Sequence, residues 1–84
     1  MEPREVLATA DSLIHGEKRE EYGGAEDSFT TIAQGWSSIT ASMITPREVA
    51  LMMIWLKITR EINKGKDDNL VDICGYAALA AKLK

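Results

Sequence analysis

Three side chains have the types and spacing of an ion pair or an anion site. Lys57 and Arg60 stand three residues apart, which places both cations on one side of a helix. Gly65 predicts a tight turn, after which Asp72 would return antiparallel and lie within about one helical turn of both cations. Two interpretations stay open. One is a salt bridge between helices, reinforced by Tyr76 four residues after Asp72. The other is an anion or phosphate site in which Lys57 and Arg60 supply the charge.

A run of oxygen-bearing side chains at residues 67–72 could hold a metal ion. Asp68 and Asp72 are four residues apart and share a helix face, and Asn69 lies on the same side as Asp72. Carboxylate oxygens with open coordination positions suit Mg²⁺. The simpler interpretation is that Asp67 or Asp68 caps the start of a helix by accepting its unpaired backbone N–H groups.

The remaining reactive side chains favour structural roles. The one histidine, His15, is expected at the surface or at a helix end, and the one cysteine, Cys74, as a small core residue that can form no internal disulfide. The favoured interpretation of the acidic residues Glu17, Glu20 and Glu21 is a charged, solvent-exposed end of a helix. The sequence contains no glycine-rich phosphate loop, zinc pattern or nucleophile–base arrangement.

Length and charge exclude several classes of protein. The 84 residues predict a single domain spanning 1–84. A net charge of −3 argues against non-specific nucleic-acid binding, which needs a clustered positive field. The longest apolar run is far shorter than the roughly 18–20 residues that a membrane span needs. Because Met1–Leu7 carries three charged side chains, we expect no signal peptide, and therefore a cytoplasmic protein.

The stretch Thr45–Asn63 carries the strongest structural signal. Thr45 and Glu48 form the pattern of a capping box, and Pro46 occupies the first helical position, where its missing N–H costs nothing. Eight apolar residues follow, Val49–Leu56, without a polar face. A helix that is apolar all round must be surrounded. We therefore expect this helix to lie at the centre of the fold and to be buried most.

Three further amphipathic segments surround this helix in the predicted fold. Apolar residues at helical spacing, with glycine or proline between segments, predict helices near residues 3–15, 25–41, 46–63 and 67–83. The fold class is all-α and four-helix bundle-like. A chain this short buries only about 60–65% of its unfolded surface. We therefore expect oligomerisation, a homodimer or larger, to complete the fold.

The chain also resembles a known group of proteins over about His15 to Leu79. The resemblance lies in the strings EYGGAEDSFTTIAQGW, ALMMIWLKITR and DNLVDICGYAAL. They are similar to small phage-encoded proteins of unknown function and to relatives of the MazG-like, all-α NTP pyrophosphohydrolases. The resemblance implies helical subunits paired into bundles. It also implies Mg²⁺ held on a nucleotide's phosphates by a Glu-x-x-Glu motif on one helix and a Glu/Asp-x-x-Asp motif on a later one.

The sequence matches these motifs in part. Asn69-x-x-Asp72 stands for the second motif, with Asn69 in place of an acid. The third predicted helix has no acidic pair for the first motif, and Lys57 sits where an acid would be expected. Either the missing acids come from elsewhere, such as Glu17, Glu20, Glu21 or Glu26, or the metal chemistry is lost. If it is kept, the expected metal ligands are Asp72, Asp68 and Glu21.

Two functions follow as hypotheses. The first is a MazG-like protein that binds a nucleotide's phosphates through Lys57 and Arg60, with Mg²⁺-dependent pyrophosphohydrolysis if it is an enzyme. The second is a non-catalytic oligomeric helical module that binds a host or phage protein as a regulator or inhibitor, in the host cytoplasm if it is phage-encoded. Because Lys57 would repel Mg²⁺, we expect weak or absent hydrolysis. Three or more carboxylates around one pocket would favour the enzyme, and a single aspartate paired with cations would favour the module.

Overall fold

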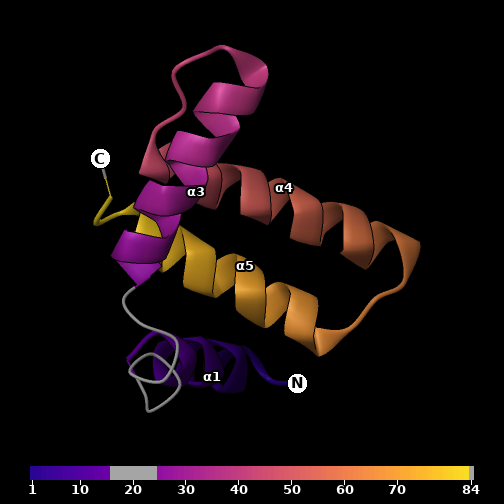
Figure 1. Cartoon of the computed structure of the whole chain (residues 1–84). Coiled ribbons are helices and arrows are strands. Elements are labelled where there is room, and N and C mark those ends of the chain that lie inside the picture. The colour runs from indigo at the N-terminus through magenta and orange to yellow at the C-terminus, as the bar shows by residue number, and fades with distance from the viewer. Residues whose placement is uncertain (16–24, 84) are drawn as a thin grey trace.

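The computed structural model describes residues 1–15 and 25–83. The described ranges contain no strand and four helices, which confirms the all-α class; they are α1 Pro3–His15, α3 Ala25–Thr40, α4 Pro46–Asn63 and α5 Asp67–Ala80 (Figure 1). The predicted bounds agree closely except at the end of α5. That helix ends before Leu83, because the backbone closes there in a tight turn in which the Leu83 N–H donates to Leu79 and Ala80 carbonyls. None of the described helices is long and apolar enough to cross a membrane.

The start of α4 is held by the capping box that the sequence predicts. The Thr45 hydroxyl accepts from the Glu48 backbone N–H at 3.1 Å, and the Glu48 carboxylate accepts from the Thr45 backbone N–H at 3.0 Å. Two backbone donors that the helix leaves unpaired are thereby satisfied. Pro46 lies in the first turn. The position at which α4 begins is therefore set by residues local in the sequence.

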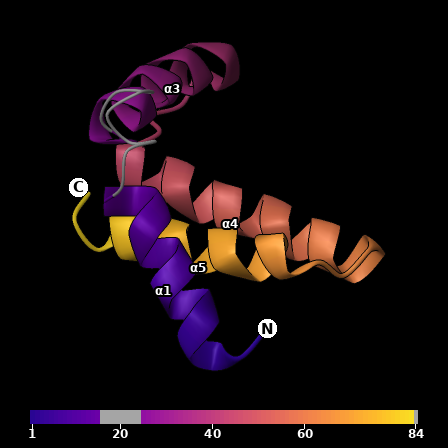
Figure 2. The same cartoon turned by 90° about the horizontal axis from the view of Figure 1, so that it is seen from below.

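The helices pack in the order α1, α5, α4, α3 (Figures 1 and 2). α5 lies between α1 and α4, and α3 packs against the beginning of α4. Four of the eight buried apolar residues in the described ranges are alanines, and Val49 and Val71 are the largest of those that are fully buried. The core consists of Ala10, Phe29, Ala33, Val49, Ala50, Val71, Ala80 and Leu83.

The prediction that residues 46–63 form the most buried helix is wrong for the single chain. α4 contributes only Val49 and Ala50 to the buried set, whereas α5 contributes Asn69, Val71, Gly75 and Ala80. The reason is the packing order. α1 packs mainly against α5, so α4 is covered chiefly by α5 along one side and by α3 near its start. Gly75 faces α1 in this arrangement, and a Cβ there would make an ordinary van der Waals contact with the Ile14 side chain at 3.7 Å.

The turn between α4 and α5 is built differently from the prediction. The N-cap of α5 is Lys66, with no side-chain cap, and neither Asp67 nor Asp68 takes that role. Instead, Glu61 reaches forward from α4, and its Oε1 accepts from the Lys66 backbone N–H at 2.9 Å and from the Asn69 Nδ2 at 3.2 Å. The Glu61 carboxylate, which belongs to the preceding helix, therefore caps the start of α5.

Candidate functional site

The ion pair between α4 and α5 is the best-defined polar contact between helices. The Lys57 Nζ lies 3.0 Å from the Asp72 Oδ2, and the two side chains are 13% and 32% exposed. This confirms the prediction that Asp72 contacts Lys57 or Arg60. Among the described residues the partner is Lys57, and Arg60 lines a different pocket. Both side chains are partly buried, so the pair fixes one point of contact between α4 and α5.

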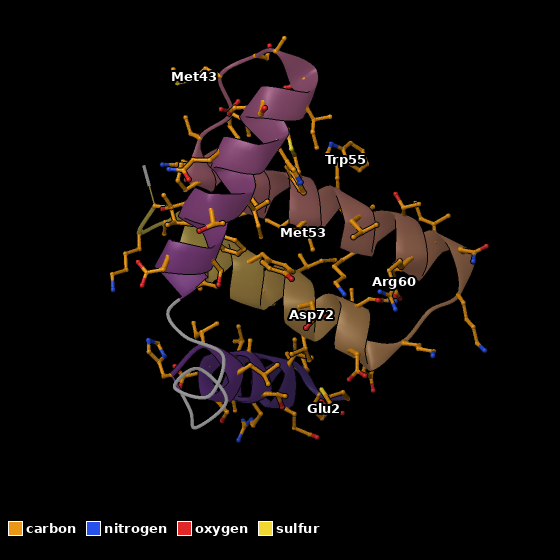
Figure 3. All side chains as sticks on the ribbon, viewed as in Figure 1. Glu2, Met43, Met53, Trp55, Arg60 and Asp72 are labelled. Atoms are coloured by element: carbon orange, nitrogen blue, oxygen red, sulfur yellow. The ribbon has the colours of Figure 1, made fainter. Side chains whose placement is uncertain are left out.

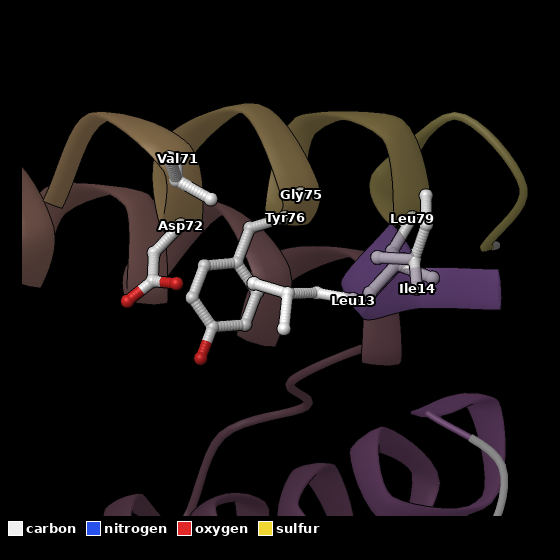
Figure 4. A pocket seen from close by; sticks show the side chains of 7 residues that line it. All are labelled: Leu13, Ile14, Val71, Asp72, Gly75, Tyr76 and Leu79. Atoms are coloured by element: carbon white, nitrogen blue, oxygen red, sulfur yellow. The ribbon is translucent and has the colours of Figure 1, made fainter. Parts of the chain in front are cut away.

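Asp72 also lines a pocket of about 210 Å³ between α1 and α5 (Figure 4). Its walls are mainly aliphatic, and its polar groups are the Asp72 carboxylate and the Tyr76 hydroxyl; the lining residues are Leu13, Ile14, Val71, Asp72, Gly75, Tyr76 and Leu79. In the described ranges Tyr76 makes no hydrogen bond to Asp72, so the expected reinforcement is not found. Its ring packs on Phe29 instead, with centroids 5.9 Å apart.

Arg60 lies at a second pocket, of about 190 Å³, beside the α4–α5 turn. Two lysines and two asparagine side chains complete its lining: Asn63, Lys64, Lys66 and Asn69. Lys57 is not part of this lining. The two cations that the sequence places together therefore lie in separate sites, Lys57 in a partly buried ion pair and Arg60 at an open pocket.

The residues expected to hold Mg²⁺ do not converge in the described part of the chain. No group of three or more His, Cys, Asp or Glu side chains is placed there to bind a metal ion. Asp72 is paired with Lys57, Asp68 is exposed in the first turn of α5, and Glu21 lies outside the described residues. Asn69, expected at the second acidic motif, is buried and donates from its amide to Glu61 and to the Lys64 carbonyl.

The other candidate side chains have structural partners. His15 is exposed, and its Nδ1 lies 2.9 Å from the Asp11 carboxylate one turn earlier in α1. Asp67 lies 3.6 Å from the Met1 amine. Cys74 is partly buried, as a small core residue would be. Glu17 and Glu20, the other acids of the predicted charged end, lie outside the described residues.

The surface feature that the sequence analysis missed is an apolar strip along the outside of α4. Its side chains are 40–82% exposed in the single chain and lie at helical spacing; they are Leu51, Met52, Trp55, Leu56 and Ile62. Figure 3 shows Trp55 on the side of α4 away from α5. We call this set the α4 face. The sequence shows the run of apolar residues, but it does not show which of these residues α5 leaves exposed.

Two global quantities show how open the chain is. Its accessible surface is 6004 Å², whereas a compact monomer of 9.3 kDa exposes about 5000 Å². Its Cα radius of gyration is 13.4 Å, against about 12 Å expected for a compact domain of this length.

Comparison with known proteins places the chain among phage proteins. Residues 5–84 match the model of a family described as Domain of unknown function (DUF6378). The chain belongs to this family. The Gene 55 protein of Mycobacterium phage L5 is 38% identical over 81 residues, which cover 94% of this chain and 52% of the relative. The Gene 55 protein of Mycobacterium phage D29 is 34% identical over 79 residues, covering 93% of this chain and 52% of the relative.

The DUF6378 match confirms the resemblance to phage-encoded proteins of unknown function. The MazG-like part of that resemblance stays a prediction. The chain spans about half the length of the curated relatives it matches. No solved structure matches it.

Proposed function

We propose that this DUF6378 domain is a non-catalytic helical module that assembles with a second copy of itself through the α4 face. The observation that carries the proposal is the exposure of large apolar side chains along one side of α4, above all Trp55, of which 68% is exposed. Monomeric soluble proteins rarely expose contiguous apolar patches of more than a few hundred Å². A second copy would cover this one.

The spacing of the α4 face fits an antiparallel pair of α4 helices. The strip runs from Leu51 to Ile62, with Trp55 and Leu56 near its middle. A two-fold axis close to Leu56 would set Leu51 against the partner subunit's Ile62, and the two Trp55 side chains near each other. In a two-fold interface the same patch serves both subunits, so one self-complementary strip is sufficient. Aromatic side chains at the centre of such a patch typically dominate its binding energy.

The test is the mass of the protein in solution for the wild type and two matched variants. We expect a wild-type mass of twice 9.3 kDa in sedimentation equilibrium, and a monomer for Trp55→Glu. The control is Leu7→Glu on α1, where a similarly exposed apolar side chain lies away from the α4 face. This variant should remain dimeric. The melting temperature of the wild type should also rise with protein concentration. A wild-type mass of 9.3 kDa at every concentration would rule the assembly out.

The MazG-like function is the second candidate. One observation favours it: Asp72, the acid that the resemblance assigns to metal binding, lines a pocket while its Oδ2 contacts Lys57. In this hypothesis Lys57 and Arg60 bind phosphate, and Asp72, Asp68 and Glu21 hold Mg²⁺. The described residues alone do not make such a site, because the one carboxylate in the pocket lining already faces an ammonium group.

A screen of common NTPs and dNTPs with Mg²⁺ or Mn²⁺ separates the two candidates. We expect little or no pyrophosphate release. Robust release that Asp72→Asn abolishes would reverse the ranking, because it would show that acids such as Glu21 complete the site. The Asp72→Asn variant should be checked by circular dichroism, so that loss of activity is not confused with loss of fold.

A further inference from the structure

The pocket beside the α4–α5 turn is lined by three cationic side chains and no carboxylate. The cations are Arg60 and Lys64 at the end of α4 and Lys66 in the turn, with Asn63 and Asn69 as the neutral polar lining. We infer that this pocket binds a phosphate group of a small molecule. The site is distinct from the Lys57–Asp72 pair, and it depends neither on the α4 face nor on hydrolysis.

The first support is that these cations have no carboxylate partner in the described part of the chain. Two nearby carboxylates are paired with other groups: Asp72 forms an ion pair with Lys57, and Asp67 lies close to the Met1 amine. Glu61 is next to Arg60 in the sequence, but its Oε1 accepts hydrogen bonds from the turn. Three positive charges around one concavity raise the local concentration of anions.

The second support is that the frame beneath the cations is held rigidly. Asn69 is only 4% exposed, and its amide joins the Glu61 carboxylate to the Lys64 carbonyl across the turn. Gly65 lets the carboxylate lie close to the turn, since a Cβ there would be 3.2 Å from the Glu61 Oε2. The backbone that carries Lys64 and Lys66 is therefore fixed before a ligand arrives, which lowers the entropic cost of binding.

The chemistry of the lining selects the class of ligand. The pocket has a volume of about 190 Å³, which leaves room for a phosphate group. Arg60 can donate two parallel hydrogen bonds to phosphate oxygens, and lysine ammonium groups act as point charges beside them. The ligand is thus inorganic phosphate or the terminal phosphate of a larger molecule whose remainder lies outside the pocket.

The experiment compares two arginines of the same helix. Arg60 and Arg47 are both exposed, at opposite ends of α4, and only Arg60 lines the pocket. Calorimetric titrations at low salt without metal would use inorganic phosphate, pyrophosphate and ATP as probes. We expect Arg60→Gln to weaken binding about tenfold or more, as loss of a charge-assisted contact does, and Arg47→Gln to leave it within about twofold. Circular dichroism should show both variants folded.

The three probes also distinguish the source of the phosphate. ATP binding tighter than both inorganic phosphate and pyrophosphate would indicate a nucleotide, and pyrophosphate binding as tight as ATP binding would indicate the free anion. The Asn63 and Asn69 side-chain amide signals in a nitrogen–proton NMR spectrum should shift with the same saturation curve. No saturable binding of any probe by the wild type would refute the inference, as would an equal loss in Arg47→Gln. Dimerisation is measured separately, so failure here leaves the proposed assembly untouched.

Discussion

Replacing Asp72 by alanine would leave the Lys57 ammonium group between α4 and α5 without its carboxylate. The direct attraction at 3.0 Å, with an effective dielectric constant of 20, is about 5.5 kcal/mol. Lost hydration cancels most of this. Exposed pairs contribute about 0.2–1 kcal/mol, and breaking a fully buried pair costs about 3–5 kcal/mol. With side chains 13% and 32% exposed, this pair lies between these limits, and we expect a loss of about 2 kcal/mol.

Asp11→Ala provides the matched control. It removes an exposed helical aspartate with a partner one turn away, and it gains the same helix propensity from alanine. Its effect should stay within about 0.5 kcal/mol. Urea denaturation at one fixed protein concentration measures both variants, because self-association would otherwise change the apparent stability. The expected loss for Asp72→Ala corresponds to a fall of about 8–16 °C in melting temperature.

A double variant shows how much of the lost stability comes from breaking the Lys57–Asp72 ion pair and how much from other effects of Asp72→Ala. Lys57→Met in the Asp72→Ala background removes the unpaired ammonium and keeps most of the apolar stem, so it should recover much of the lost stability. Asp72→Ala unfolding at the same urea concentration as Asp11→Ala would refute the reasoning. It would show that the Lys57–Asp72 contact is solvated and contributes nothing to the register of the two helices.

Three other changes test the local structure. Glu61→Ala should cost about 1–3 kcal/mol in urea denaturation, because it removes the shorter of the two hydrogen bonds that the buried Asn69 amide donates, while Glu61→Gln should retain most of the stability. Gly35→Ala should stabilise α3 by about 1 kcal/mol, since nothing lies within 4 Å of the added Cβ. A loss of dimer in sedimentation would instead show that a partner packs there. Thr45→Ala should lower stability by about 1 kcal/mol through loss of the capping box, with a matching fall in melting temperature; an unchanged value would contradict the geometry at Glu48.

The helices and the ends of α4 could be predicted from the sequence because their causes are local. The Thr45–Glu48 capping box and Pro46 act within a few residues, and so does the helical spacing of apolar side chains. The contact between Lys57 and Asp72 could also be predicted, because a short turn between antiparallel helices limits which residues can face each other.

Tertiary packing determined the features that the sequence did not predict. The separation of Arg60 from Lys57 follows from a rotation of α4 that places one side chain toward α5 and the other at the turn, and residue spacing alone does not set that rotation. The long-range bond from Glu61 to Asn69 displaced the expected aspartate cap. The sequence shows that α4 is apolar, but only the order α1, α5, α4, α3 decides which side stays uncovered, because burial depends on neighbours distant in the chain.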